Sequence, residues 1–265
     1  MGYEHIRYET DARVATVTLD RERYRNAQSR RLLEELDAAF AEAAADDAIR
    51  VIVLAGAGEH FSSGHDLGTP EEVADAKARP YPKGQRGVLE RSWGLYVENS
   101  LRWRELPKPT IARVQGLCIF GGYLIASVMD LIIAADDARF LPAHLQLFNA
   151  PWDLGVRKSK EILFENRFIE AAEALEIGLV NRVVPRAELE EQTAALAARI
   201  AQQDLLSLRM TKFSINQAQD AMGYRTMALA AHSNFMVLAN SGRVRRGDEK
   251  RLKGVDRALN KKSAD

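Results

Sequence analysis

The sequence predicts an α/β fold with a mainly parallel sheet, followed by a helical C-terminal region. Short apolar segments typical of strands alternate with amphipathic, helix-forming segments up to about Arg157, an order that indicates βα units. Glycine-rich turns follow two of these strands at their C-terminal ends, where open α/β sheets bind ligands. With 265 residues, the chain is long enough to bury a large core.

The first part of the chain predicts a strand, a helix and a second strand. Residues 14–20, VATVTLD, alternate apolar with polar side chains, as in a half-buried strand. Residues 29–46 favour an amphipathic helix, because one face carries Leu32, Leu33, Leu36, Phe40 and Ala43. Residues 50–56, RVIVLAG, are apolar on both faces, which predicts a buried parallel strand. Residues 69–87 are polar, contain several prolines and glycines, and are expected to form an insertion-like segment.

The middle and the end of the chain predict further βα units and then helices. In chain order we expect a strand at 108–116, a glycine-rich turn at 117–122, a helix at 123–130, strands at 131–136 and 138–142, helices beyond Arg157, a C-cap at Gly178, a strand at 179–185 and long helices to about Asn240. We therefore divide the chain into an α/β core over residues 1–195 and a helical C-terminal region over residues 196–265. The latter ends in a basic, polar tail, which is either a solvated end or a partner contact.

Composition excludes several classes of protein. Lys and Arg together number 37, as do Asp and Glu, so no net field favours nucleic acid or an anionic membrane. The single cysteine, Cys118, cannot form an internal disulfide and fits a reducing compartment. The N-terminus lacks the apolar region of a signal peptide, and no apolar run approaches the roughly 18 residues of a membrane span. We expect a cytoplasmic protein without nucleic-acid or membrane partners.

Residues 59–68, EHFSSGHDLG, combine potentially reactive side chains with glycines. His60 and His65 lie five residues apart in a loop, without the helical spacing or paired cysteines of a zinc site, so we expect no metal. Neither Ser62 nor Ser63 lies in a G-x-S-x-G nucleophile elbow. The segment also lacks both the dinucleotide-binding and the P-loop motifs.

The backbone of the two glycine-rich turns is the remaining candidate. The second turn, Phe120-Gly121-Gly122, opens a predicted helix, so its first N–H groups have no partner within that helix. Two peptide N–H groups that converge from separate turns would form an oxyanion hole for a carbonyl that becomes an anion. Alternatively, the glycines only permit tight turns and close helix packing. The spacing leaves both interpretations open.

Four segments resemble the crotonase superfamily, that is, the enoyl-CoA hydratase/isomerase family. They are RERYRNAQS, RVIVLAGAGEHFSSGHDL, PKPTIARVQGLCIFGGYLIASVMDLIIAADDARFLP and EALEIGLVNRVVPRAEL, in the order and spacing of the family. The resemblance extends over roughly Tyr3 to Asn240. It implies a spiral of ββα units with a helical C-terminal region that drives trimerisation, so we expect a homotrimer or a hexamer built as a dimer of trimers.

The resemblance also implies an acyl-CoA thioester as the substrate, with coenzyme A as part of it and no separate cofactor. At the matched positions, the peptide N–H groups of His65 and Gly121 would form the oxyanion hole. The CoA moiety would contact residues of the first loops and a distant lysine, namely Arg25, Asn26, Ala27, Gly64, Asp66 and Lys212. Solvated surface charge is the alternative for Arg25 and Lys212. For Asp66 the alternative is a loop or helix cap.

The sequence departs from the family where a hydratase carries its two glutamates. Those positions hold Leu124 and Ala143, neither of which can transfer a proton, and Phe120 stands where the first glycine of a GGG turn is usual. His144 is a candidate replacement acid or base, or an ordinary histidine at a strand end. Asp153 is a second candidate, or a turn or N-cap aspartate.

These departures favour lyase-type chemistry in fatty-acid metabolism, namely hydration or dehydration, decarboxylation or C–C cleavage. A methylmalonyl-CoA decarboxylase-like branch of the family resembles this chain in its SGHD segment, residues 63–66, and the role of the His65 imidazole stays open. The alternatives are an acyl-CoA isomerase or hydrolase, and a non-catalytic acyl-CoA-binding member of the family.

Overall fold

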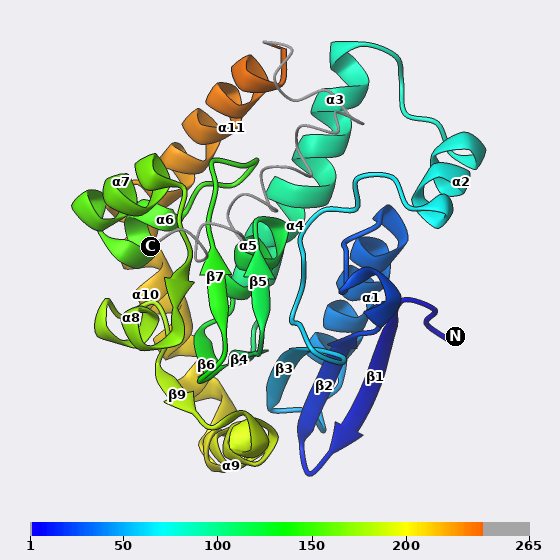
Figure 1. The fold of residues 1–265 in the computed structure, drawn as a ribbon. Coiled ribbons are helices and arrows are strands. Elements are labelled where there is room, and N and C mark those ends of the chain that lie inside the picture. The colour runs from blue at the N-terminus through cyan, green and yellow to red at the C-terminus, as the bar shows by residue number, and fades with distance from the viewer. Residues whose placement is uncertain (1, 241–265) are drawn as a thin grey trace.

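The fold is seen in a computed structural model that describes residues 2–240 (Figure 1). The basic tail lies outside the described residues, as does any partner contact expected of it. The structure confirms an α/β architecture with a mainly parallel sheet and helices at the C-terminal side of the chain.

Two sheets form the centre of the molecule. The larger has the order β1-β2-β3-β4-β6-β9, and its strands are β1 (Ile6–Asp11), β2 (Val14–Leu19), β3 (Val51–Gly56), β4 (Thr110–Val114), β6 (Leu131–Ala135) and β9 (Arg182–Val184). Only the β1–β2 hairpin is antiparallel in this sheet. The smaller sheet contains β5 (Leu117–Ile119), β7 (Arg139–Leu141) and β8 (Ile169–Glu170) in that order, with β5 parallel to β7.

Helices cover both faces of the larger sheet, as a parallel sheet requires. On one face α1 (Arg30–Ala45) buries the apolar residues that the sequence predicts, and Ser29 caps its first turn by accepting a hydrogen bond from the Leu32 N–H. On the other face α9 (Leu189–Ala201) packs against Val51, Val53 and Ile111. The alternate residues Ile52 and Leu54 belong to the main core on the α1 side. Strand β3 is therefore apolar on both faces, as predicted.

The segment between β3 and β4 is mostly helical. It holds α2 (Pro70–Ala78), α3 (Gln85–Ser92), the π-helix η2 (Trp93–Glu98) and α4 (Asn99–Arg104). The Thr69 side chain caps α2, and Pro70 begins it, so part of the expected insertion is a regular helix with a sequence-encoded start.

The remaining helices follow the second βα unit. They are α5 (Gly121–Ser127), α6 (Ala150–Leu154), α7 (Val156–Glu165), α8 (Ala171–Glu176), α10 (Leu205–Ala221) and α11 (Tyr224–Asn240). Two 3-10 turns lie elsewhere, at Glu22–Tyr24 between β2 and α1 and at Arg186–Glu188 before α9. Helix α11 lies beside α3 (Figure 1), and the Ser92 hydroxyl is 2.9 Å from His232 Nε2. The expected boundary at residues 195–196 falls inside α9, and the division into two parts stays a prediction. Within residues 2–240, every helix is too short or too polar to cross a bilayer.

Candidate functional site

Two loops converge next to the first turn of α5. Residues 62–64 run beside the end of β5, since the Ser62 N–H donates to the Leu117 carbonyl and the Ser62 carbonyl accepts from Ile119, both at 3.0 Å. A Cβ atom on Gly64 would lie 2.7 Å from the Ile119 carbonyl oxygen and 3.0 Å from the Gly121 nitrogen. Gly64 also has φ +90°. Only glycine fits this position, and its lack of a side chain lets the two loops approach.

The same loop is held on its other side by residues 26–28. The Gln28 N–H donates to the Gly64 carbonyl at 2.8 Å, and the Asp66 N–H donates to the Gln28 carbonyl at 3.0 Å. Asn26 is fully buried, and its carboxamide nitrogen donates to the carbonyls of Ala57, His60 and Phe61. Main-chain hydrogen bonds therefore fix residues 62–66 from both sides.

Helix α5 begins at this junction. Phe120 precedes it with φ +50° and ψ −104°. A residue with a Cβ atom rarely adopts this backbone conformation, which stores strain. Gly121 is the first helical residue, so its N–H has no carbonyl acceptor inside the helix. The structure thus brings His65 and Gly121, the two expected oxyanion-hole residues, into adjacent loops.

The His65 imidazole lies between two buried glutamines. Its Nδ1 is 3.3 Å from Gln28 Oε1, and its Nε2 is 3.0 Å from Gln146 Oε1. The ring also stacks on Tyr96 of the π-helix, with ring centroids 4.1 Å apart. A Cβ on Gly121 would lie 2.4 Å from His65 Nδ1 and 2.5 Å from Gln28 Oε1, so this polar cluster packs directly on the Gly121 α-carbon.

The sequence did not single out Gln28 or Gln146 as site residues. A neutral carboxamide does not titrate and belongs to no ligand motif, so nothing in the sequence distinguishes these two glutamines from solvated ones. The one available signal was that Gln28 directly follows Asn26 and Ala27, which the family resemblance already assigned to the CoA-contacting segment.

Leu124 belongs to α5, and Ala143 and His144 follow β7. Leu124 is buried in α5, and Ala143 packs against the main core. The His144 ring contacts Phe148, with centroids 4.9 Å apart, and bonds to the backbone of Ala231 in α11. Burial lowers the pKa of His144 despite this bond, and so favours the neutral imidazole.

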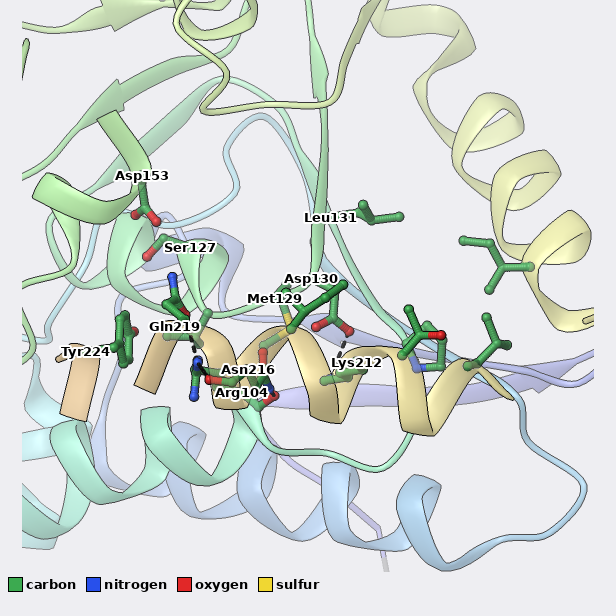
Figure 2. A pocket seen from close by; sticks show the side chains of 16 residues that line it. Arg104, Ser127, Met129, Asp130, Leu131, Asp153, Lys212, Asn216, Gln219 and Tyr224 are labelled. Atoms are coloured by element: carbon green, nitrogen blue, oxygen red, sulfur yellow. Dashed lines mark hydrogen bonds and ion pairs between the residues drawn. The ribbon is translucent and has the colours of Figure 1, made fainter. Parts of the chain in front are cut away.

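Asp153 lies at the opposite end of α5 from Gly121. It lines a cavity of about 450 Å³ together with Ser127 and Tyr224, and no residue of the two converging loops lines it (Figure 2). The Tyr123 hydroxyl donates to the Asp153 carboxylate at 3.1 Å. Burial raises the pKa of Asp153 to about 7, although the bond from Tyr123 opposes this. His65 and Gly121 are not among the residues that line this cavity.

Lys212 faces the same cavity. Its ammonium group is 2.8 Å from the Asp130 carboxylate and 3.1 Å from the Lys108 carbonyl, and its side chain is 9% exposed (Figure 2). A CoA phosphate at Lys212 would have to compete with Asp130. Arg25, in contrast, is exposed beside the candidate site, and its carbonyl accepts from the Ser63 N–H.

Asp66 braces the loop that follows His65. Its carboxylate accepts from the N–H groups of Gly68 and Thr69 and forms a buried ion pair with Arg21 at 3.0 Å. Burial alone would raise the pKa of Asp66, but the hydrogen bonds from Thr69, Gly68 and Arg21 outweigh it and hold the pKa below its ordinary value. The geometry is that of a loop residue that supports the start of α2.

A metal site in the described part of the chain would require a suitable geometry of ligand side chains. No group of three or more His, Cys, Asp or Glu side chains within residues 2–240 has a geometry that would hold a metal ion. Cys118 is buried and free of a disulfide, and burial raises the pKa of its thiol well above the ordinary value.

Comparison with known proteins gives a consistent set of relatives. Residues 9–261 match the family model described as enoyl-CoA hydratase/isomerase. EchA13 of Mycobacterium tuberculosis is 40% identical over 243 residues, which cover 84% of this chain and 76% of that protein. The crystal structure of a probable enoyl-CoA hydratase from Mycobacterium thermoresistibile has a TM-score of 0.81 and 41% identity, and covers 88% of this chain and 94% of its own. An enoyl-CoA hydratase/isomerase structure from Xanthobacter autotrophicus Py2 has a TM-score of 0.82 and 31% identity, with 97% of each chain covered.

Proposed function

Because the chain belongs to the enoyl-CoA hydratase/isomerase family, whose members bind acyl-CoA substrates, we propose that it stabilises a thioester enolate in a backbone oxyanion hole. The donors are the peptide N–H groups of His65 and Gly121. The observation that supports the proposal is the close approach of Gly64, whose carbonyl carbon forms the peptide bond to His65, to the Gly121 nitrogen. Each such donor stabilises a developing oxyanion by about 3–4 kcal/mol in sites of this kind.

The reaction is of the lyase type. Hydration of an enoyl-CoA needs an acid and a base, and Leu124 and Ala143 supply neither at the positions where the family resemblance puts two glutamates. Decarboxylation needs less, because the C–C bond to the carboxylate breaks, CO₂ leaves and the electron pair passes into the enolate. A hole without adjacent glutamates suits that step. C–C cleavage or dehydration would use His144 as the proton-transfer group, or Asp153 if the acyl chain reaches the cavity at the far end of α5.

CoA binds, in this proposal, along the loops that frame the hole. Arg25 offers an exposed guanidinium for a phosphate, while Asn26, Ala27, Gly64 and Asp66 shape the loops that the adenine and pantetheine contact. Lys212 joins this set only if its bond to Asp130 opens.

The chain assembles, we further propose, as a homotrimer or a dimer of trimers. Exposed apolar side chains on α10 support an interface there, namely Leu206, Met210, Phe213 and Ile215. Light scattering on the purified protein tests this, and a monomer at micromolar concentration contradicts it.

The function is tested by steady-state assays on a panel of acyl-CoA thioesters, including crotonyl-CoA and a 2-carboxyacyl-CoA. We expect slow hydration of crotonyl-CoA and turnover of another thioester. Hydration of crotonyl-CoA at the rate of an ordinary hydratase would overturn the inference that Leu124 and Ala143, in place of two glutamates, remove hydratase activity. Binding of acyl-CoA without turnover of any thioester would favour the alternative of a non-catalytic binding protein. The variants His144→Ala and Asp153→Ala test the proton-transfer groups, and unchanged turnover dismisses both.

A further inference from the structure

A chain of three polar side chains ends beside the proposed oxyanion hole. Gln146 contacts His65, His65 contacts Gln28, and Gln28 packs on the Gly121 α-carbon. Gln28 is 2% exposed and Gln146 is 6% exposed, so the two carboxamides are shielded from water. The Nε2 atom of Gln28 is buried and has no hydrogen-bond partner among the described residues. A buried donor without a partner is costly, and a functional role at the site is one physical reason for such a donor to persist.

The chemistry of the imidazole limits the hydrogen-bond directions that this chain can have. A neutral imidazole has one donor and one acceptor nitrogen, so it cannot donate to the oxygens of both glutamines. If the Gln146 carboxamide turns its NH₂ group to His65 Nε2, then His65 Nδ1 donates to Gln28 Oε1. If His65 is an imidazolium ion, it donates to both Gln146 Oε1 and Gln28 Oε1, and Gln28 Oε1 again accepts from His65. In both of these arrangements His65 engages Gln28 Oε1, which is the atom that packs on Gly121. Gln28 Nε2, on the same carboxamide, is left as a buried donor without a partner among the described residues.

We propose that Gln28 is a specificity-determining residue, whose Nε2 donates to an oxygen on the α or β substituent of the acyl chain. The thioester oxygen has two lone pairs, and the His65 and Gly121 peptides occupy both in the proposed hole. A third donor therefore addresses a different oxygen. Because Gln28 packs on Gly121 itself, that oxygen belongs to a hydroxyl, keto or carboxylate group within two carbons of the thioester. Gln146 and His65 are positioning residues for this contact.

This inference rests on the proposed function, and calorimetric titration separates the two. The ligands are butyryl-CoA, which has no oxygen beyond the thioester, and acetoacetyl-CoA, which has a β-keto oxygen on a chain of the same length. The readout is the ratio of the two Kd values. Loss of one hydrogen bond between neutral groups typically changes an affinity by about three- to tenfold.

Two replacements separate the donor from the rest of the side chain. Gln28→Leu removes both polar atoms at similar volume, and Gln28→Glu keeps an acceptor for His65 Nδ1 while removing the N–H donors. We expect both to reduce the preference for acetoacetyl-CoA by about three- to tenfold and to leave the Kd of butyryl-CoA within a factor of two. Gln202→Leu, at an exposed glutamine, is the matched control and should leave the ratio unchanged.

The results that overturn the inference are specific. An unchanged ratio in Gln28→Leu, or a ratio that Gln28→Glu preserves, shows that Nε2 does not donate to the ligand. If circular dichroism shows the variants to be folded and the affinity for both ligands falls equally, then Gln28 contacts the thioester group or supports the structure of the loop instead. If the unmodified protein binds neither ligand, the proposed function itself fails.

Discussion

Replacing Gly64 by alanine tests how closely the two loops approach each other. An L-residue in the left-handed region costs about 1–2 kcal/mol, and Gly64 has φ +90°. The new Cβ would also lie 2.7 Å from the Ile119 oxygen and 3.0 Å from the Gly121 nitrogen, both main-chain atoms that cannot rotate away. Overpacking of this kind costs about 1–3 kcal/mol more. We therefore expect the free energy of unfolding to fall by about 2–5 kcal/mol.

Gly178→Ala is the matched control for this experiment. Gly178 has φ +78°, but a Cβ added there would meet no atom within 4 Å, so only the conformational cost applies. Denaturation by guanidinium chloride measures both variants, and the difference between them isolates the collision. Acyl-CoA affinity provides the second readout, because displacement of the Gly121 N–H should weaken binding in Gly64→Ala and not in Gly178→Ala. Equal stability of the two variants, with equal affinity, would refute the close approach.

Three further predictions concern Phe120, Asn26 and Asp153. Because φ of Phe120 is +50°, the Phe120→Gly variant should be more stable to unfolding than Phe120→Ala by about 1 kcal/mol. Denaturation of the two variants measures the difference, and the reverse order argues against strain at this residue. Asn26→Asp removes a donor shared by three buried carbonyls and should lower stability by about 2–3 kcal/mol, whereas a loss below about 0.5 kcal/mol contradicts that role. Burial raises the pKa of Asp153 to about 7, whereas the pKa in the unfolded chain is about 4. Between these two values the native state binds more protons than the unfolded chain, so the free energy of unfolding falls as pH rises from about 4 to about 7. Asp153→Asn should flatten this dependence between pH 4 and pH 8 in denaturation experiments, and an unaltered slope rules out Asp153 as its source.

The larger elements of the fold were predictable because each has a local cause. Helix α1 follows from its apolar stripe and the Ser29 cap, and β3 follows from a run that is apolar on both faces. Helix α2 was missed, although Thr69 and Pro70 form a recognisable start, because the prolines and glycines after it dominated the interpretation of that segment. Local patterns indicate elements well, but a short polar helix between breakers gives a weak signal.

The candidate site was predictable in its main chain and not in its side chains. Gly64 marks a position where two backbones approach, whereas Gly121 leaves room for the side chains of His65 and Gln28. The contacts of His65, by contrast, come from residues 28, 96 and 146, which lie far apart in sequence and meet only after folding. The distance of Asp153 from the two loops likewise depends on how α6 packs at the far end of α5.

Residues 62–66 are held by main-chain hydrogen bonds to Gln28 on one side and to β5 on the other, through one isolated parallel β-bridge on each side. These bonds do not depend on which side chains surround the loop, so its shape is insulated from changes at positions such as 124 and 143. Evolution or design could therefore exchange one reaction for another here by altering a few facing side chains, without rebuilding the peptide groups that we propose as the oxyanion hole.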